Sequence, residues 1–266
     1  MTTIRKRYVD GSWGQVHLRV AGENRTERVP LLLLHPTPKS GWIYEPIMLP
    51  LGSDRPVIAP DTPGYGASDP PPSPASIEAL ADEMLDVSRG VVGDGAIDVM
   101  GYHTGSVIAV AMALARPECV RRLVLTSLPT YSADERAAKR ESLAQWRRPV
   151  DDGSHVMAMW TLMQKLVDPR AGINWMHASF VENLRCGSRA PWGYDAVYQY
   201  DLEAALGRLD HPALVLAPED DLYRQTLRGI TLMKSARSEE LPGVGHGVFD
   251  LKTDHIVTLV SDFLDR

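Results

Sequence analysis

Residues 97–105, with the sequence IDVMGYHTG, carry the side chains whose type and spacing most clearly indicate chemistry. An apolar run leads into a Gly-x-His-x-Gly turn, and a helix-forming segment follows. This order is typical of a nucleophile elbow, a turn so sharp that small residues must flank an apex side chain held above the edge of a sheet. Serine is the usual apex residue, whereas His103 occupies this position here.

An imidazole at the apex allows more than one kind of reaction. A neutral imidazole has a lone pair, so His103 could attack an acyl carbon and form an acyl-imidazole that water then cleaves. With an ordinary pKa of about 6.5 it could instead act as a general acid or base. A third interpretation is loss of catalysis, in which His103 only fills the site. The sequence leaves all three open and does not separate a native histidine from an engineered one.

The elements around this turn predict an α/β fold, with a mostly parallel, doubly wound sheet and helices on both faces. Apolar runs of strand length alternate with helical stretches up to residue 127, and the alternation returns after residue 210. Between them lie helical stretches rich in tryptophan and tyrosine. We therefore expect a core of residues 1–127 and 210–266, with residues 128–209 inserted as a helical cap.

Five segments of the chain resemble segments of the α/β-hydrolase family. In chain order they are LLLLHPTP, VIAPDTPGYGASD, GYHTG, ALVLAPEDD and LPGVGHG, and together they cover nearly the whole sequence. The resemblance implies the α/β-hydrolase fold. It also implies the chain order nucleophile, acid and histidine, which assigns these catalytic positions to His103, Asp221 and His246. Glu219 and Asp220 are near alternatives for the acid.

The same resemblance implies an oxyanion hole formed by the backbone N–H groups of Thr37 and Thr104. Pro36 stands where the family usually has glycine and has no N–H to donate, but Thr37 has one, so two donors remain. The aromatic content of the cap predicts a mostly apolar pocket for a small molecule. The candidate substrate-binding residues are Trp146, Trp160, Trp175, His177 and Trp192. The same aromatic side chains could instead form the interface between cap and core.

Composition excludes several classes of protein. A net charge of −6 without a long Lys/Arg cluster argues against a nucleic-acid partner. The longest apolar runs are shorter than the ~20 residues that span a bilayer. Cys119 and Cys186 are too few for a disulfide framework and lie in no Cys-x-x-Cys motif. We therefore expect a cytoplasmic protein with no metal and no cofactor, whose partner is a small-molecule substrate; the oligomeric state is not predicted.

Three functional hypotheses follow from these observations. The first is a cofactor-independent hydrolase that acts on a small, mostly apolar ester, lactone or related carbonyl compound. The second is a lyase or other non-hydrolytic enzyme that uses His103 and His246 as an acid–base pair. The third is a non-catalytic ligand-binding protein on the same fold. The sequence identifies neither the natural substrate nor its stereochemistry.

Overall fold

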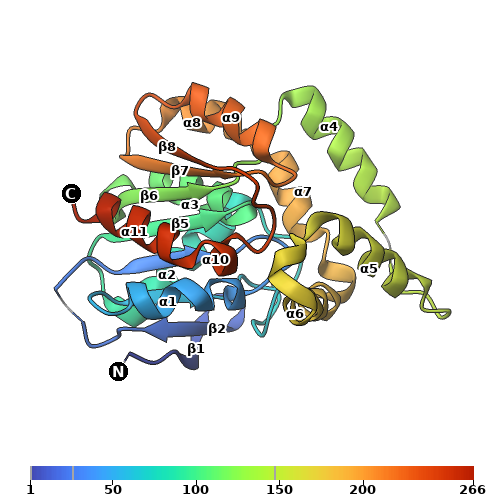
Figure 1. The fold of residues 1–266 in the computed structure, drawn as a ribbon, viewed down its shortest axis with the longest axis horizontal. Coiled ribbons are helices and arrows are strands. Elements are labelled where there is room, and N and C mark those ends of the chain that lie inside the picture. Colours follow the sequence, from blue (N-terminus) through green and yellow to red (C-terminus); the bar gives the residue numbers. More distant parts are fainter. Residues whose placement is uncertain (1, 26, 147) are drawn as a thin grey trace.

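The computed structural model of the chain describes residues 2–25, 27–146 and 148–266 (Figure 1). Within these residues, eight strands form one sheet in the order β1-β2-β4-β3-β5-β6-β7-β8. Strand β2 pairs antiparallel with β1 and β4, and the other neighbours are parallel. This confirms the predicted α/β class with its mostly parallel sheet. The strands are β1 (Arg5–Gly11), β2 (Gly14–Ala21), β3 (Leu31–Leu34), β4 (Val57–Pro60), β5 (Ile97–Tyr102), β6 (Val120–Thr126), β7 (Ala213–Pro218) and β8 (Ala236–Leu241).

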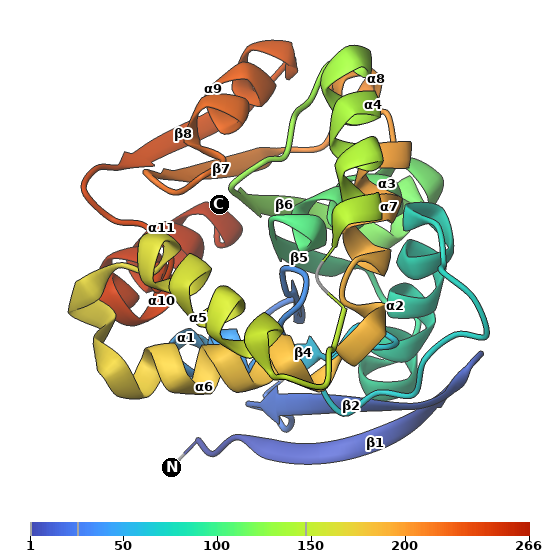
Figure 2. The same cartoon turned by 90° about the vertical axis from the view of Figure 1, so that its right-hand side faces the viewer.

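Helices cover both faces of the sheet, as the view in Figure 2 shows. One face is covered by α2 (Ile77–Val92), α3 (Thr104–Ala115), α8 (Leu202–Arg208) and α9 (Tyr223–Leu232). The other is covered by α1 (Glu45–Leu51), α10 (Val248–Leu251) and α11 (Thr253–Leu264). The four leucines of β3 are fully buried, as expected for a central strand with a helical layer on each side.

Four further helices lie beyond one end of the sheet, on the right of Figure 1: α4 (Ala133–Ser142), α5 (Ser154–Leu166), α6 (Gly172–Arg185) and α7 (Trp192–Gln199). They connect β6 to β7 through the segment predicted as a cap. The boundaries at residues 128 and 209 stay a prediction. Within that segment, α8 packs against α3 and α9, because Leu202, Ala205 and Leu206 belong to the hydrophobic core beside the sheet.

Where residues are described, each helix is too short or too polar to cross a membrane.

Helix α2 begins after Ser76, whose hydroxyl accepts a hydrogen bond from the backbone N–H of Ala79 at 3.2 Å, and Arg89 lies in its last turn. The hydroxyl satisfies an N–H group that has no partner within the helix, and the arginine matches the preference of the helix dipole for a cation at the C-terminal end.

Candidate active site

His103 is the apex of the turn between β5 and α3. Its backbone has φ 51° and ψ −115°, a conformation that few non-glycine residues adopt. A Cβ added to Gly101 would lie 2.4 Å from the backbone of Gly105, and one added to Gly105 would lie 1.8 Å from the carbonyl oxygen of Leu34. The turn therefore requires both glycines, which explains the Gly-x-His-x-Gly pattern of the sequence.

The His103 side chain faces a cavity of about 110 Å³ between the sheet end and the cap, which His246 and Asp221 also line. The imidazole is 14% exposed, so a small molecule in the cavity can reach it. Apolar residues form much of the wall, with a few polar groups at defined points. The apolar wall includes Ile43, Met163, Leu166, Val167 and Trp175, and the polar positions include Lys39, Ser179, Asn183 and Tyr194.

Two histidine–carboxylate pairs lie side by side at the base of this cavity. His103 Nε2 is 2.9 Å from Oδ2 of Asp220, and His246 Nε2 is 2.8 Å from Oδ1 of Asp221. The two imidazole rings are 5.3 Å apart between centroids. The Asp220 side chain is fully buried, whereas that of Asp221 is 47% exposed. Sequence reasoning named both aspartates as candidates for one acid, but it did not anticipate that each would pair with its own histidine.

Tyr102 lies between the two pairs. Its hydroxyl is 3.3 Å from His246 Nδ1 and 3.5 Å from Oδ2 of Asp220, and its side chain is fully buried. The same Asp220 oxygen also accepts a hydrogen bond from the Ser127 hydroxyl at 2.6 Å. A polar chain therefore connects the two imidazoles through groups that are shielded from water. The residue before the apex gave no signal of this role in the sequence.

The charges in this cluster favour ionised groups. Burial on its own would lower the pKa of His103, but the charge of Asp220 and the hydrogen bond to it raise that pKa above its ordinary value. Burial likewise opposes ionisation of Asp220, yet His103 holds the pKa of this carboxyl below its ordinary value. For Asp221, burial is outweighed by the hydrogen bond to His246, and its pKa is also lowered. The base of the cavity thus carries two carboxylates at neutral pH.

One of the two predicted oxyanion-hole residues lies at the edge of the same cavity. Thr37 lines it, and the peptide bond between Thr37 and Pro38 is cis. Thr104 is the first residue of α3, where backbone N–H groups have no partner within the helix. The Tyr194 hydroxyl donates to the carbonyl oxygen of Thr37 at 3.0 Å and so ties this loop to α7. A two-donor oxyanion hole stays a prediction.

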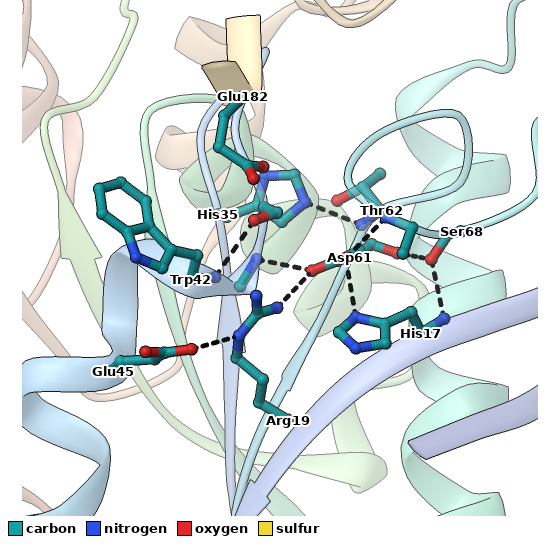
Figure 3. A network of polar contacts seen from close by, with 12 residues as sticks. His17, Arg19, His35, Trp42, Glu45, Asp61, Thr62, Ser68 and Glu182 are labelled. Carbon is teal, nitrogen blue, oxygen red and sulfur yellow. Dashed lines mark hydrogen bonds and ion pairs between the residues drawn. The ribbon is translucent and has the colours of Figure 1, made fainter. Parts of the chain in front are cut away.

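A buried polar network supports the loop that carries Thr37 (Figure 3). Oδ1 of Asp61 accepts hydrogen bonds from the backbone N–H of Gly41 at 2.8 Å and from Arg19 at 3.0 Å. Its Oδ2 lies 2.8 Å from His17 Nδ1. The Asp61 side chain is 1% exposed, and burial is outweighed by these partners, which lower its pKa to about 2. Through its hydrogen bond with Gly41, the Asp61 carboxylate holds this loop in place.

His35, at the end of β3, is part of the same support. Its Nε2 accepts a hydrogen bond from the backbone N–H of Thr62 at 2.8 Å, and its Nδ1 lies 2.9 Å from the carbonyl oxygen of Pro36. The ring is buried, and burial lowers its pKa. Both ring nitrogens are therefore engaged with backbone, which leaves His35 a structural role.

Lys39 connects the same loop to the cap. Its amine donates to the backbone carbonyl of Ser179 at 2.8 Å, to the Ser179 hydroxyl at 2.6 Å and to Oδ1 of Asn183 at 2.6 Å. Burial lowers the pKa of Lys39 to about 7, while the nearby Glu182 and Cys186 act in the opposite direction. This lysine fixes α6 over the cavity, and no motif in the sequence pointed to it.

Of the five cap residues predicted to bind substrate, the structure brings only Trp175 to the cavity of His103. Trp146 lines a separate cavity of about 180 Å³, and Trp192 lines a third, smaller one. Trp160 packs edge-on against Phe180, with ring centroids 5.2 Å apart, and His177 is exposed on α6. Met163 and Leu166 of α5 form the wall instead.

Comparison with known proteins agrees with this architecture. A family model described as the alpha/beta hydrolase family matches residues 31–255. The chain therefore belongs to the α/β hydrolase family and is an enzyme of that family.

Individual relatives are distant. The 2-hydroxymuconate semialdehyde hydrolase of Pseudomonas sp. (strain CF600) is 28% identical over 254 residues, which cover 88% of this chain and 86% of that protein. The polyketide synthase ThaQ of Burkholderia thailandensis is 27% identical over 242 residues, 85% of this chain but 11% of the synthase. The solved structure of the enol-lactonase from Burkholderia xenovorans LB400 has a TM-score of 0.82 at 17% identity and covers 98% of this chain and 100% of that one. At this identity it shows the fold alone.

Proposed function

We propose that this protein hydrolyses a small, mostly apolar ester, lactone or related carbonyl compound, with water as the attacking group. The observation that carries the proposal is the presence of two histidine–carboxylate pairs at the base of one cavity, where the family usually has a serine. The relative described as a semialdehyde hydrolase supports a carbonyl substrate. The apolar wall and the cavity of about 110 Å³ favour a small molecule.

In this mechanism the two pairs have different tasks. The His246–Asp221 pair accepts a proton from water as the water oxygen bonds to the carbonyl carbon. The backbone N–H groups of Thr37 and Thr104 stabilise the negative charge that forms on the carbonyl oxygen. When the bond to the leaving group breaks, the leaving oxygen takes a proton from the His103–Asp220 pair. The products are an acid and an alcohol, and the Tyr102 hydroxyl offers a path by which the proton returns between the pairs.

Water, rather than His103, is the proposed nucleophile because of the contacts that His103 makes. Its Nε2 is committed to the buried Asp220 carboxylate, and the negative charge there stabilises the protonated ring. A protonated imidazole has no lone pair with which to attack a carbon. The charged form is suited to donate a proton or a hydrogen bond.

The same two pairs would also suit the second hypothesis, a lyase reaction, in which one pair removes a proton and the other supplies one. The discriminating test is a panel of short-chain nitrophenyl esters and lactones, run in water enriched in oxygen-18. Hydrolysis by direct attack of water places the label in the acid product during the first turnover. Consumption of a substrate without incorporation of the label contradicts the hydrolase proposal and favours the lyase.

The proposal also places the protein in the cytoplasm. Both cysteines, Cys119 and Cys186, are free and buried, which is compatible with the reducing cytoplasm.

A further inference from the structure

The histidine at the apex places two imidazoles and a carboxylate around one point. One nitrogen or oxygen atom from each of His103, Asp221 and His246 lies within 4.8 Å of the other two. All three side chains line the same cavity. Two imidazoles and one carboxylate, with an open side toward a cavity, form the donor set that catalytic zinc sites and related first-row metal sites use. A serine at the apex would not complete this set.

The outer partner of His103 fits this use. Imidazoles that bind metals almost always donate their other N–H to a carboxylate, a carbonyl or water, which fixes the ring and makes the free nitrogen a better ligand. His103 Nε2 has such a partner, since it lies 2.9 Å from the fully buried Asp220 carboxylate. Nδ1 is then the ring nitrogen that remains for a ligand.

His246 shows the same division between its two nitrogens. Its Nδ1 faces the Tyr102 hydroxyl at 3.3 Å, and that hydroxyl lies 3.5 Å from Asp220. Its Nε2 is directed to the Asp221 carboxylate at 2.8 Å. His246 Nδ1, which has the buried outer partner, thus faces away from Asp221. His246 Nε2 already lies beside the Asp221 carboxylate, the third ligand of the site.

The spacing brings the three side chains within reach of one metal ion once they rotate toward it. Zinc bonds to histidine nitrogen and carboxylate oxygen are about 2.0–2.2 Å long, so ligand atoms in a tetrahedral site are roughly 3.3 Å apart. The present separations bracket this value, since one is 2.8 Å and none exceeds 4.8 Å. Asp221 is 47% exposed and lies in a loop, so its carboxylate can rotate without disturbing the core.

We propose that His103, Asp221 and His246 bind one divalent transition-metal ion, with Zn²⁺ as the ion best suited, and that the fourth position opens to the cavity. This inference rests on the proposed function and deepens it. A metal ligand needs a lone pair, so binding would take the proton from His103, which could then no longer act as the acid. Zinc at this point would hold the attacking water and lower the pKa of that water to about 7 in place of the His246–Asp221 pair, and as a Lewis acid it would replace His103 in neutralising the charge on the reacting oxygen. The sequence gave no metal motif, because the three residues are 25 to 143 positions apart and meet only in the fold.

The test measures metal binding directly, apart from activity. Chelator-treated protein is titrated with ZnCl₂ by calorimetry, and the zinc content of the dialysed complex is measured by mass spectrometry. We expect one zinc per chain for the native protein. His103→Ser, Asp221→Asn and His246→Ala should each weaken binding by more than the roughly 10- to 100-fold loss that is typical for an outer partner. Tyr102→Phe should fall within that smaller range.

His255→Ala is the matched control, because His255 is an exposed histidine on α11 whose Nε2 is 3.8 Å from Glu239, away from the cavity. It should bind zinc as the native protein does. Circular dichroism of each variant checks that it is folded, and Asp221→Asn, at an exposed position, keeps the test valid if a buried variant does not fold. Native protein without stoichiometric zinc, or ligand variants that bind as tightly as the control, would overturn the metal site.

The two proposals fail separately. If the chelator-treated protein hydrolyses esters and zinc does not bind, the metal site is wrong and the proposed hydrolysis stands. If zinc binds through the three residues but neither form hydrolyses any ester or lactone, the metal site stands and the proposed function is wrong.

Discussion

Asp220 and Asp221 are adjacent in the chain, yet they bind different histidines. Asp220 is fully buried and lies 2.9 Å from His103, whereas Asp221 is half-exposed and lies 2.8 Å from His246. Both residues lie in the bend and turn between β7 and α9, so one short segment serves both sides of the site. A histidine at the apex, where the family usually has serine, therefore finds a charged partner in Asp220.

Asp221→Asn should lower the turnover number with little change in KM. The asparagine amide cannot stabilise a charged His246, and an acid that orients the histidine acts in the transition state rather than in binding. Steady-state kinetics on the best ester of the panel provides the measurement. Glu219→Gln is the comparison, because Glu219 binds the backbone N–H of Gly243 at 2.7 Å instead of a histidine. A silent Asp221→Asn beside a damaging Glu219→Gln would mean that the acid is misassigned.

His246→Ala should reduce kcat/KM by about 10²- to 10⁴-fold, the usual cost of removing a general base. The fold should persist, since His246 lies in a loop and its side chain is 20% exposed. The variant is assayed on the same ester, and its thermal unfolding is compared with that of the native protein. Retention of full activity in a folded His246→Ala protein would rule out the proposed site.

His103→Ser separates the hydrolase from the lyase. It restores the family's usual apex residue, so a hydrolase should keep or gain esterase activity and accumulate an acyl-enzyme that mass spectrometry detects. A lyase should lose activity, because a serine hydroxyl does not exchange protons near pH 7 as imidazole does. Both reactions are measured with native protein and variant. Unchanged kinetics in the variant without an acyl-enzyme would exclude any role of His103.

Lys39→Met should raise KM at all pH values and remove a pH dependence that the native protein shows. Because the pKa of Lys39 is lowered to about 7, the ammonium ion predominates below pH 7 and the amine above it. Loss of a proton removes one of the three hydrogen bonds to α6, so the native KM should rise as the pH passes from 6 to 8. Lys165→Met, an exposed lysine on α5, is the control. Parallel KM profiles for the native protein and Lys39→Met would contradict this role.

Asp61→Asn should destabilise the protein by about 3 kcal/mol at pH 7, since it leaves Arg19 with a buried charge that has lost a partner. The pKa of Asp61 is lowered to about 2, so its stabilising effect is complete above pH 4 and disappears as the pH falls toward 2. The difference in unfolding free energy between native and variant should therefore shrink over that interval in urea titrations. Asp151→Asn, on an exposed loop, should show no such difference.

The sequence predicted the α/β class and its mostly parallel sheet well, because these depend on local patterns. His103, Asp221 and His246 line one cavity, and their catalytic roles stay a prediction. Strand length, glycine at positions 101 and 105, and the order of the five segments are all visible in the linear chain. The walls of the cavity were predicted poorly for a physical reason. Bulky aromatic residues such as Trp160 bury most apolar surface when they pack against other residues of the helical segment. Residues such as Met163 then form the wall of the cavity. The spacing of Met163 in the sequence indicates a buried helix face but does not reveal what that face contacts.

The pairing of His103 with Asp220 depends on geometry that no sequence pattern encodes. Nothing in the sequence distinguishes the buried aspartate from the exposed one when the two are adjacent in a loop. Only the path of the backbone after β7 decides which one is buried. Tyr102 is a similar case. Its position before the apex is visible, but the direction of its hydroxyl follows from the packing of the whole sheet end.

The two glycines of the elbow have a consequence for how this fold changes over time. Since Gly101 and Gly105 alone satisfy the close approaches to the backbone, the shape of the turn does not depend on which side chain stands between them. Serine, cysteine, aspartate or histidine can therefore replace one another at the apex by a few nucleotide changes while the fold stays intact. New chemistry at this position can therefore arise from the exchange of one residue and be refined afterwards by changes in the loops around it.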